Sequence, residues 1–204
     1  MTRSKAPAPS IDFRPLRRDD FPTLAGWLVE PHIARWWADD ATPAGLEADY
    51  GGCIDGSEPA EVFVACVEEQ ALGFVQRYRL AAYPDYRDEL AALAPIPPGA
   101  WGIDYLIGPP SLIGRGWGRA MVERFVGKLW QDDIEAVCVV VATHADNPAS
   151  WRTLASAGFA RVAAGDMAPD NPADDRRHLV YRLDRPLDVA PALNAATAAR
   201  RRAA

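Results

Sequence analysis

Three glycines at alternate positions, Gly114, Gly116 and Gly118, mark the stretch of this chain that is richest in chemistry. They follow an apolar run at residues 101–107 that predicts a β-strand. They precede residues 120–130, in which apolar side chains recur at helical spacing. The glycines therefore lie where a strand is expected to give way to a helix.

A strand-to-helix turn of this kind favours anion binding. The first N–H groups of a helix have no partner within it and lie at the positive end of the helix dipole. Arg115 and Arg119 add positive charge, so the segment is predicted to cradle a phosphate or pyrophosphate. The spacing excludes the dinucleotide G-x-G-x-x-G fingerprint, and the missing Gly-Lys-Ser/Thr excludes a Walker loop. The alternative is a tight turn that needs glycine only for its positive φ.

Length and composition are typical of one soluble enzyme-sized domain. The chain has 204 residues, 49% of them hydrophobic, which suffices for a full core. Its net charge of −6 argues against nucleic acid as the main partner and suits a cationic small molecule. Three widely spaced cysteines without a CxxC pair indicate neither a disulfide framework nor a metal site. No apolar segment has the length of a signal peptide or membrane span, so we expect a cytoplasmic protein without membrane contact. These features do not specify the oligomeric state.

The periodicity of the chain predicts a mixed sheet with helices. Residues 1–10 are expected to be a disordered lead, residues 11–184 one domain, and residues 185–204 an Ala/Arg-rich tail. Strands are expected at 11–16, 62–67, 71–78, 101–107, 136–142, 159–163 and 178–183, and helices at 21–28, 42–50, 120–130 and 149–156. With one parallel crossover, from 101 to 142, this order predicts an α+β (α/β mixed sheet) fold.

Local signals place several boundaries. Asp19 or Asp20 is expected to cap the first helix, and Thr42 and Asn147 are expected to cap two later ones. Residues 81–99 contain four prolines and no clear period, which predicts a long loop with at most one helical turn.

Two motifs in order resemble the GNAT superfamily of N-acetyltransferases. Gly116 and Gly118 match the end of the acyl-coenzyme A loop R/Q-x-x-G-x-G/A, with Ile113 in place of the usual Arg or Gln. Residues 147–159 match N-x-x-(A/S)-x-x-x-(Y/L)-x-x-x-G-F, which follows the strand beside the cofactor cleft in that family. The resemblance covers residues 11–184 and implies the GNAT acyl-CoA N-acyltransferase fold with acetyl-CoA as co-substrate.

The resemblance also implies how the co-substrate is held. The pyrophosphate lies on the backbone of the glycine turn, the pantetheine arm on an asparagine, and the thioester oxygen on a strand N–H. The implied residues are Arg115, Gly116, Trp117, Gly118 and Arg119 for the pyrophosphate, Asn147 for pantetheine, and Leu106 or Ile107 for the oxygen.

Three further segments narrow the resemblance to aminoglycoside 6′-N-acetyltransferases. They are residues 32–37 with paired tryptophans, residues 73–78, and the Gly-Ile-Asp-Tyr at 102–105. The same segments are similar to enzymes that acylate the side-chain amine of siderophore precursors. The implied function is acetylation of a primary amine of an aminoglycoside, the 6′-amine, giving antibiotic resistance. The implied acceptor residues are Trp36, Trp37, Gln76, Tyr78, Asp85, Asp104 and Tyr105.

Asp104 is the implied catalytic residue. The attacking amine must be neutral, so its proton has to go to an acceptor. An ordinary Asp, with a pKa of ~3.9, is a weak base at neutral pH. We therefore expect Asp104 to hold the ammonium group and to accept its proton late, directly or through water. The alternative for Asp104 is a purely structural role. The alternative for Trp36 and Trp37 is packing in the core.

Two departures from the family pattern leave alternatives open. Leu154 stands where the family often has a Tyr that protonates the leaving thiolate, and Tyr105, Tyr78 or His144 are the candidates to replace it. Ala142 stands where an acidic residue is common among the aminoglycoside enzymes.

A polyamine acceptor also calls for several carboxylates. An acidic rim is expected from Asp39, Asp40 and Glu47, with Asp85, Asp88 and Glu89 in or beside the long loop. The alternative functions are acylation of a siderophore precursor, polyamine or protein terminus, and non-catalytic sensing of acyl-CoA.

Overall fold

The computed structural model describes residues 10–169, 171 and 173–187. Nearly all of the predicted lead (1–10) and of the predicted tail (185–204) lies outside the described residues. None of the described helices is long and apolar enough to cross a membrane.

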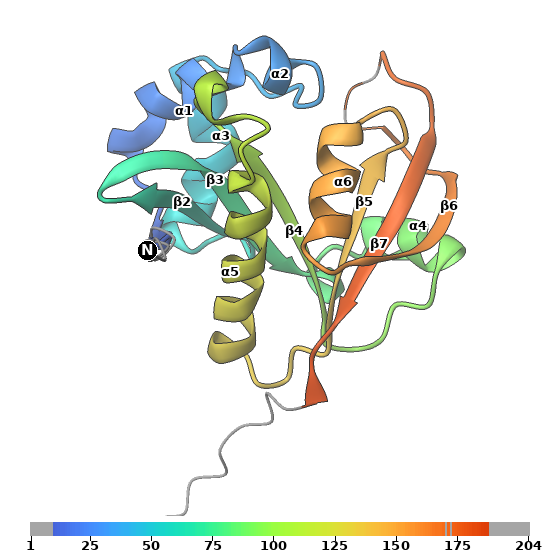
Figure 1. Cartoon of the computed structure of the whole chain (residues 1–204). Coiled ribbons are helices and arrows are strands. Elements are labelled where there is room, and N and C mark those ends of the chain that lie inside the picture. The colour runs from blue at the N-terminus through green and yellow to red at the C-terminus, as the bar shows by residue number, and fades with distance from the viewer. Residues whose placement is uncertain (1–9, 170, 172, 188–204) are drawn as a thin grey trace, which may run out of the picture.

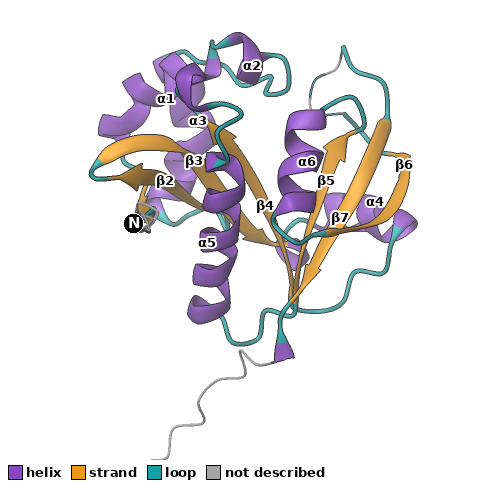
Figure 2. Cartoon of the chain, viewed as in Figure 1, coloured by secondary structure: helices purple, strands orange, loops and turns teal. Residues whose placement is uncertain are grey.

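Seven strands form one mixed sheet in the order β1-β2-β3-β4-β5-β7-β6. Figure 2 shows β2, β3 and β4 on one side of this sheet and β5, β7 and β6 on the other. The strands are β1 (Asp12–Pro15), β2 (Glu61–Val67), β3 (Gln70–Arg79), β4 (Ala100–Ile107), β5 (Cys138–His144), β6 (Ala160–Asp166) and β7 (Arg177–Asp184). The helices are α1 (Phe21–Leu28), α2 (Pro31–Ala34), α3 (Pro43–Asp55), α4 (Pro84–Leu93), α5 (Trp117–Asp132) and α6 (Pro148–Ser156). The predicted α+β mixed sheet is confirmed.

The sheet divides between its fourth and fifth strands. β4 and β5 run parallel but pair only at Ala100 with Cys138 and at Trp101 with Val139. Beyond these residues the two strands separate toward Ile107 and His144, and Figure 1 shows them diverging. The strands therefore leave a split between an N-terminal part, β1–β4, and a C-terminal part, β5, β7 and β6.

Helices cover both faces of each part. α1 and α3 pack on one face of β1–β4, in a cluster that includes Leu24, Leu46 and Phe74. α5 packs on the opposite face through Phe125 and Leu129. On the C-terminal part, α6 lies on the same side as α5, and α4 lies on the side of α3.

Several local predictions are confirmed. The hairpin of β2 and β3 turns at Glu68 and Glu69, both with positive φ. Thr42 caps α3, because its Oγ1 accepts the Gly45 N–H at 3.1 Å. Asn147 caps α6 in the same way, accepting the Ser150 N–H at 3.1 Å.

One local prediction holds only in position, and another is wrong. Asp20 is the N-cap residue of α1, but its carboxylate accepts from Arg14 and from the Arg17 N–H instead of from the helix. The expected long loop at residues 81–99 contains α4, a helix of 10 residues with Pro84 in its first turn. Pro84 suits that place because the first N–H groups of a helix are unpaired in any case.

Candidate functional site

The glycine turn leads directly into α5. Gly114 and Gly116 have φ of 72° and 84°, which favours glycine, and a Cβ at either would meet no heavy atom within 4 Å. Gly116 is the N-cap of α5 and has no side chain to accept the first N–H groups of the helix. These donors thus face an open approach, as an anion cradle requires.

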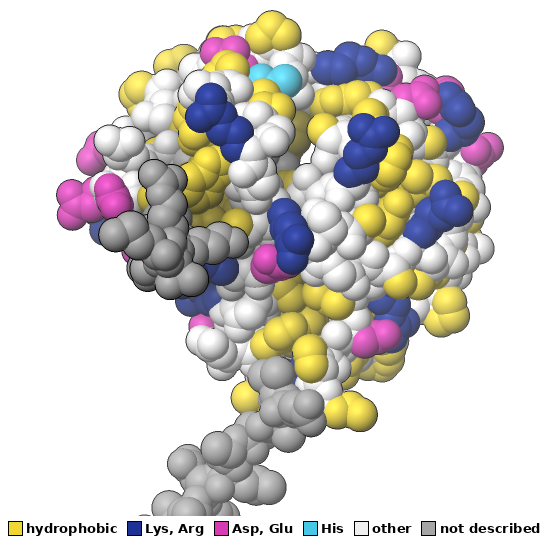
Figure 3. All heavy atoms as spheres, viewed as in Figure 1, with side chains coloured by type: hydrophobic (Ala, Val, Ile, Leu, Met, Phe, Trp, Pro, Cys, Tyr) yellow, Lys and Arg dark blue, Asp and Glu magenta, His cyan; other side chains and the backbone are white. Residues whose placement is uncertain are grey.

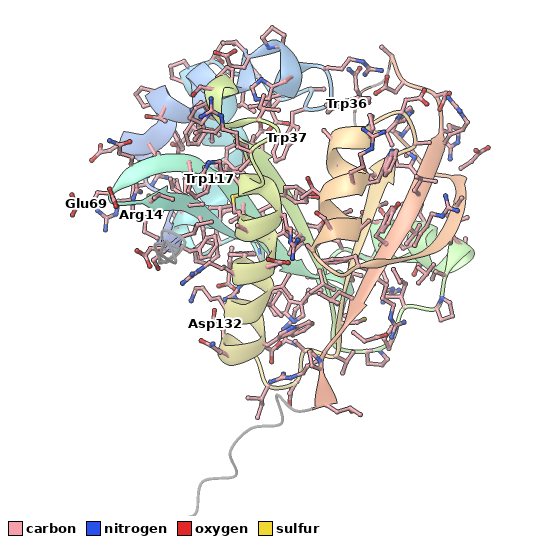
Figure 4. All side chains as sticks on the ribbon, in the orientation of Figure 1. Arg14, Trp36, Trp37, Glu69, Trp117 and Asp132 are labelled. Carbon is pink, nitrogen blue, oxygen red and sulfur yellow. The ribbon has the colours of Figure 1, made fainter. Side chains whose placement is uncertain are left out.

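Gly118 serves a different purpose. A Cβ there would lie 3.3 Å from Oγ1 and 3.4 Å from Cγ2 of Thr153 in α6, and 3.9 Å from Cγ1 of Ile107. The missing side chain therefore lets the start of α5 approach both α6 and the end of β4. Trp117 packs its ring into the cluster around Met121, so only its backbone is placed for the cradle (Figure 4).

Basic side chains surround the two helix starts. Arg115 and Arg119 are exposed, and Arg119 pairs with Glu123 at 2.7 Å. Arg152 on α6, which the sequence analysis missed, is exposed and lies over the ring of Trp151. Figure 3 shows Lys and Arg prominent over α5 and α6, with Asp and Glu mostly at the margins of this face. A polyanion is favoured here although the chain is acidic overall.

Asn147 uses its side-chain oxygen as a helix cap. Beside it, Trp151 donates its indole N–H to the Ala145 carbonyl at 3.2 Å, which fixes the loop between β5 and α6. The asparagine is thus held at the mouth of the split, the open end at which β4 ends at Ile107 and β5 ends at His144.

β4 presents side chains to both faces of the sheet. Side chains alternate along a strand, so Asp104 and Tyr105 point in opposite directions. Asp104 faces the α3 and α4 side, where its carboxylate accepts from Gln76 Nε2 at 2.8 Å and from the Tyr78 hydroxyl. Gly102 makes room for Tyr78, because a Cβ there would lie 2.5 Å from the tyrosine ring. Three predicted acceptor residues, Asp104, Gln76 and Tyr78, are thus brought together.

Tyr105 does not join this group. It faces α5 and α6, and its hydroxyl lies 3.2 Å from the Ser150 carbonyl and 3.3 Å from Ser150 Oγ. Burial raises the pKa of the Tyr105 hydroxyl. The residue therefore lies on the side of the glycine turn rather than on the side of Asp104.

The two predicted oxygen-binding amides are not equivalent. The Gly108 N–H donates to the Leu72 carbonyl of β3, and N–H directions alternate along a strand, so the Leu106 N–H also faces β3. The Leu106 side chain is buried in the core as well. The Ile107 N–H faces the open edge, where the neighbouring Ile107 carbonyl accepts from His32 Nε2 at 3.0 Å. Only Ile107 is placed as the prediction requires.

The paired tryptophans lie beside the split but contact different parts (Figure 4). Trp36 lies 5.7 Å, between ring centroids, from His144 of β5, and the Arg35 guanidinium lies over its ring. Trp37 packs edge-on against Phe74 of β3 and belongs to the core of the N-terminal part. Trp36 is the half-buried ring at the mouth, whereas Trp37 mainly supports it.

An acidic and aromatic group extends from Asp104 toward α3. The Tyr50 hydroxyl donates to Asp39, and burial together with Asp39 raises the pKa of Tyr50. Burial also raises the pKa of Asp49, with Asp39 and Asp40 contributing. The sequence analysis did not single out Tyr50 or Asp49.

Aromatic side chains continue this group toward α4. The ring of Tyr78 contacts both Tyr83 and Tyr86, and Tyr86 lies on α4. The sequence analysis missed both contacts because it expected a loop in place of α4.

Most of the other predicted rim acids have structural partners. Glu47 pairs with Arg18 at 2.7 Å, Asp88 with Arg87, and Glu89 accepts the Ala168 N–H. Asp85 is exposed in the first turn of α4, where the helix dipole favours a carboxylate.

A polar bridge joins the two parts at the mouth. Arg35 pairs with Asp174 in the segment between β6 and β7 through two contacts, of 2.6 and 2.8 Å, and the guanidinium lowers the pKa of that carboxyl. His144 accepts the Asp146 N–H and contacts Asp175 at 3.1 Å. His144 thus holds the loop after β5 through these two contacts. Among the described residues, no group of three or more His, Cys, Asp or Glu is arranged to hold a metal ion.

The split sheet, the glycine turn at a helix start and the following capped helix define an acyl-coenzyme A-dependent transferase. The acetyltransferase (GNAT) domain family model matches residues 17–167. The chain belongs to this family, and its acetyl donor is acetyl-CoA.

Relatives within the family are more specific. The chain is 27% identical over 169 residues, 80% of each chain, to the aminoglycoside N(6′)-acetyltransferases type 1 of Klebsiella pneumoniae and Serratia marcescens. The fold resembles that of the aminoglycoside acetyltransferase AAC(6′)-Ib in complex with coenzyme A, with TM-score 0.73, 24% identity, and 86% and 95% of the two chains covered. It also resembles the ribosomal-protein-S5-alanine acetyltransferase of Vibrio fischeri, with TM-score 0.63, 16% identity, and 85% and 92% coverage.

The residues present fit acetyl-CoA. The open glycine turn and the unpaired N–H groups of α5 suit the pyrophosphate, and Arg115, Arg119 and Arg152 supply countercharge. The Ile107 N–H on the open edge of β4 suits the thioester oxygen. Acetyl-CoA supplies the activated acetyl group, and the chain supplies position and proton transfer.

Proposed function

We propose that this protein transfers acetyl from acetyl-CoA to a primary amine of an aminoglycoside, the 6′-amine, and so confers resistance. The observation that carries the proposal is the acidic and aromatic group around Asp104, on the face of β4 opposite the glycine turn. The relatives named as aminoglycoside N(6′)-acetyltransferases support the acceptor class. The proposed setting is cytoplasmic, where the donor is made and the drug acts.

Asp104 is the proposed catalytic residue. Its carboxylate, held by Gln76 and Tyr78, would hold the acceptor amino group, which gives up its ammonium proton to water before it attacks, and would accept the second proton that the nitrogen loses once the C–N bond forms. Because two donors fix the carboxylate, the amine is aligned rather than merely attracted. The developing charge on the thioester oxygen would be met by the Ile107 N–H.

The remaining polar groups are proposed to select a polycation. Asp39 and Asp49 lie around Tyr50 and offer a second carboxylate site for another ammonium group. The Trp36 ring offers a flat apolar wall for a sugar ring. Each further exposed pair would contribute about 0.2–1 kcal/mol to acceptor binding.

Thiol release from acetyl-CoA tests the proposal. We expect release with kanamycin or tobramycin, and much less with lysine or spermidine. Asp104→Ala should lower kcat/KM by about 10²–10⁴-fold while coenzyme A still binds. Asp184→Asn is the control, because Asp184 pairs with Arg182 at the end of β7 opposite Cys138, where β4 and β5 still pair, and its removal should leave kinetics unchanged.

Other outcomes would redirect the proposal. If thiol is released with lysine or another small amine but not with an aminoglycoside, the protein is still an acetyltransferase. Its acceptor is then a siderophore precursor or a polyamine. Tight acetyl-CoA binding without release with any amine would indicate a non-catalytic sensor. Resistance itself is measured by the inhibitory concentration of tobramycin for a susceptible host that expresses wild type or Asp104→Ala.

A further inference from the structure

The Tyr105 side chain crosses the split from β4 to α6. β4 and β5 are unpaired beyond Trp101, yet the Tyr105 hydroxyl reaches both the carbonyl and Oγ of Ser150 in the first turn of α6. The Tyr105 ring also packs against two hydrophobic clusters, one around Phe125 and one around Met121. A phenol hydroxyl is thus fixed inside the split, on the face that carries the glycine turn.

Along β4, Tyr105 lies nearer than the glycine turn to the residues at which β4 and β5 pair. Ile107 on the same face of β4 lies against the Gly118 position, and Tyr105 precedes it by two residues, roughly 7 Å along the strand. A group that extends from the start of α5 along β4 toward Trp101 would therefore run beside Tyr105.

Ser150 is the residue of α6 that the Tyr105 hydroxyl contacts. Helical side chains lean toward the N-terminus, so residue 154 covers the turn that begins near Ser150. Leu154 occupies that place, fully buried and apolar. Tyr105 brings a hydroxyl to the same turn from the opposite strand.

The hydroxyl is protonated throughout the working pH range. Burial raises the pKa of Tyr105, the neighbouring Asp104 carboxylate raises it further, and the Ser150 hydrogen bond opposes both. Ser150 is half-buried, so part of this residue is accessible to water.

We propose that Tyr105 donates the proton to the sulfur of the leaving coenzyme A. This inference rests on acetyl transfer but not on the identity of the acceptor. The C–N bond forms from the amine lone pair, and the C–S bond breaks with its electron pair on sulfur. The Tyr105 O–H proton passes to that sulfur, the amine proton passes to Asp104 and then to water, and water returns a proton to Tyr105 through Ser150. The products are the acetamide and the free thiol.

A titration of bound coenzyme A tests the proposal without any acceptor. The thiolate is followed by its ultraviolet absorbance in complexes with wild type and with Tyr105→Phe, and calorimetry confirms binding. A hydrogen bond from Tyr105 favours the thiolate, so the thiol pKa should be about one unit higher in the variant. Equal thiol pKa values in both complexes, or loss of coenzyme A binding by the variant, would overturn the proposal.

Kinetics with an active amine provide the second test. Tyr105→Phe should lower kcat about 100-fold, as for a lost general acid, with the KM for acetyl-CoA unchanged. Leu154→Tyr in the Tyr105→Phe background should restore part of kcat, whereas Leu154→Phe should not. Equal recovery with both would assign the effect to bulk rather than to a hydroxyl and would refute the donor role. A wild type that uses lysine but not tobramycin would change the acceptor class only.

Discussion

Gly118→Val tests whether the close approach of α5 to α6 holds the glycine turn in place. A Cβ at this position lies 3.3 Å from Thr153 Oγ1 and 3.4 Å from Cγ2, and valine adds two methyl groups beyond it. Inserting such groups into a packed contact costs about 1–3 kcal/mol. For a domain of this size about 2 kcal/mol lowers Tm by about 4–8 °C.

The assay is thermal unfolding combined with coenzyme A calorimetry. Moving the first turn of α5 away from α6 displaces the N–H groups of the cradle, and we expect about tenfold weaker binding, or about 1.4 kcal/mol. Adding Thr153→Ala removes both contacting atoms and should recover most of the loss in Tm. The matched control is Gly127→Ala in the middle of α5, where a Cβ would meet nothing within 4 Å. This control should stabilise the domain by about 0.4–1 kcal/mol.

Either of two results would refute this reasoning. One is a Gly118→Val variant that melts with the wild type and binds coenzyme A as tightly. The other is a Thr153→Ala effect that simply adds to that of Gly118→Val, because contacting residues should couple by about 0.5–3 kcal/mol.

Ion pairs of two arginines away from the site, Arg77 and Arg14, give further predictions. Arg77 is buried between Glu61 and Asp132, so Arg77→Met should keep its packing but lower the free energy of unfolding by about 1–2 kcal/mol in urea titrations. Asp20→Asn removes the two-contact pair with Arg14, which lowers the pKa of Asp20 in the folded state. The resulting loss of unfolding free energy should be present in full at neutral pH. It should shrink as the pH falls below about 3.9 toward the pKa of Asp20 in the folded state, because the wild type then loses the same charge. A difference in unfolding free energy between wild type and Asp20→Asn that stays constant over that pH range would contradict the prediction.

The sequence predicted those features that depend on neighbouring residues. Thr42 and Asn147 cap helices because their oxygens reach an N–H three residues on, and such contacts are visible in the order of residues. The β4–turn–α5 unit followed from an apolar run, glycines and helical spacing. Asp104 and Gln76 meet because they face each other in the register of β3 and β4.

Contacts between distant segments were not predictable in this way. Arg35 and Asp174 are separated by 139 positions, and only the folded sheet brings them together. The opposite directions of Asp104 and Tyr105 follow from strand alternation, but which face receives the acceptor depends on how the helices pack. α4 was missed because its polar sequence buries fully only Leu90, so its apolar pattern is weak.

The two-residue pairing between β4 and β5 divides the sheet into two hydrogen-bonded units. Opening of one unit breaks few backbone bonds of the other, and proteins open locally along such boundaries. Amide hydrogen exchange in β6 and β7 should therefore follow that of β5 and differ from that of β3 and β4. A ligand in the split contacts both units, so coenzyme A should slow exchange in both together and merge two opening reactions into one.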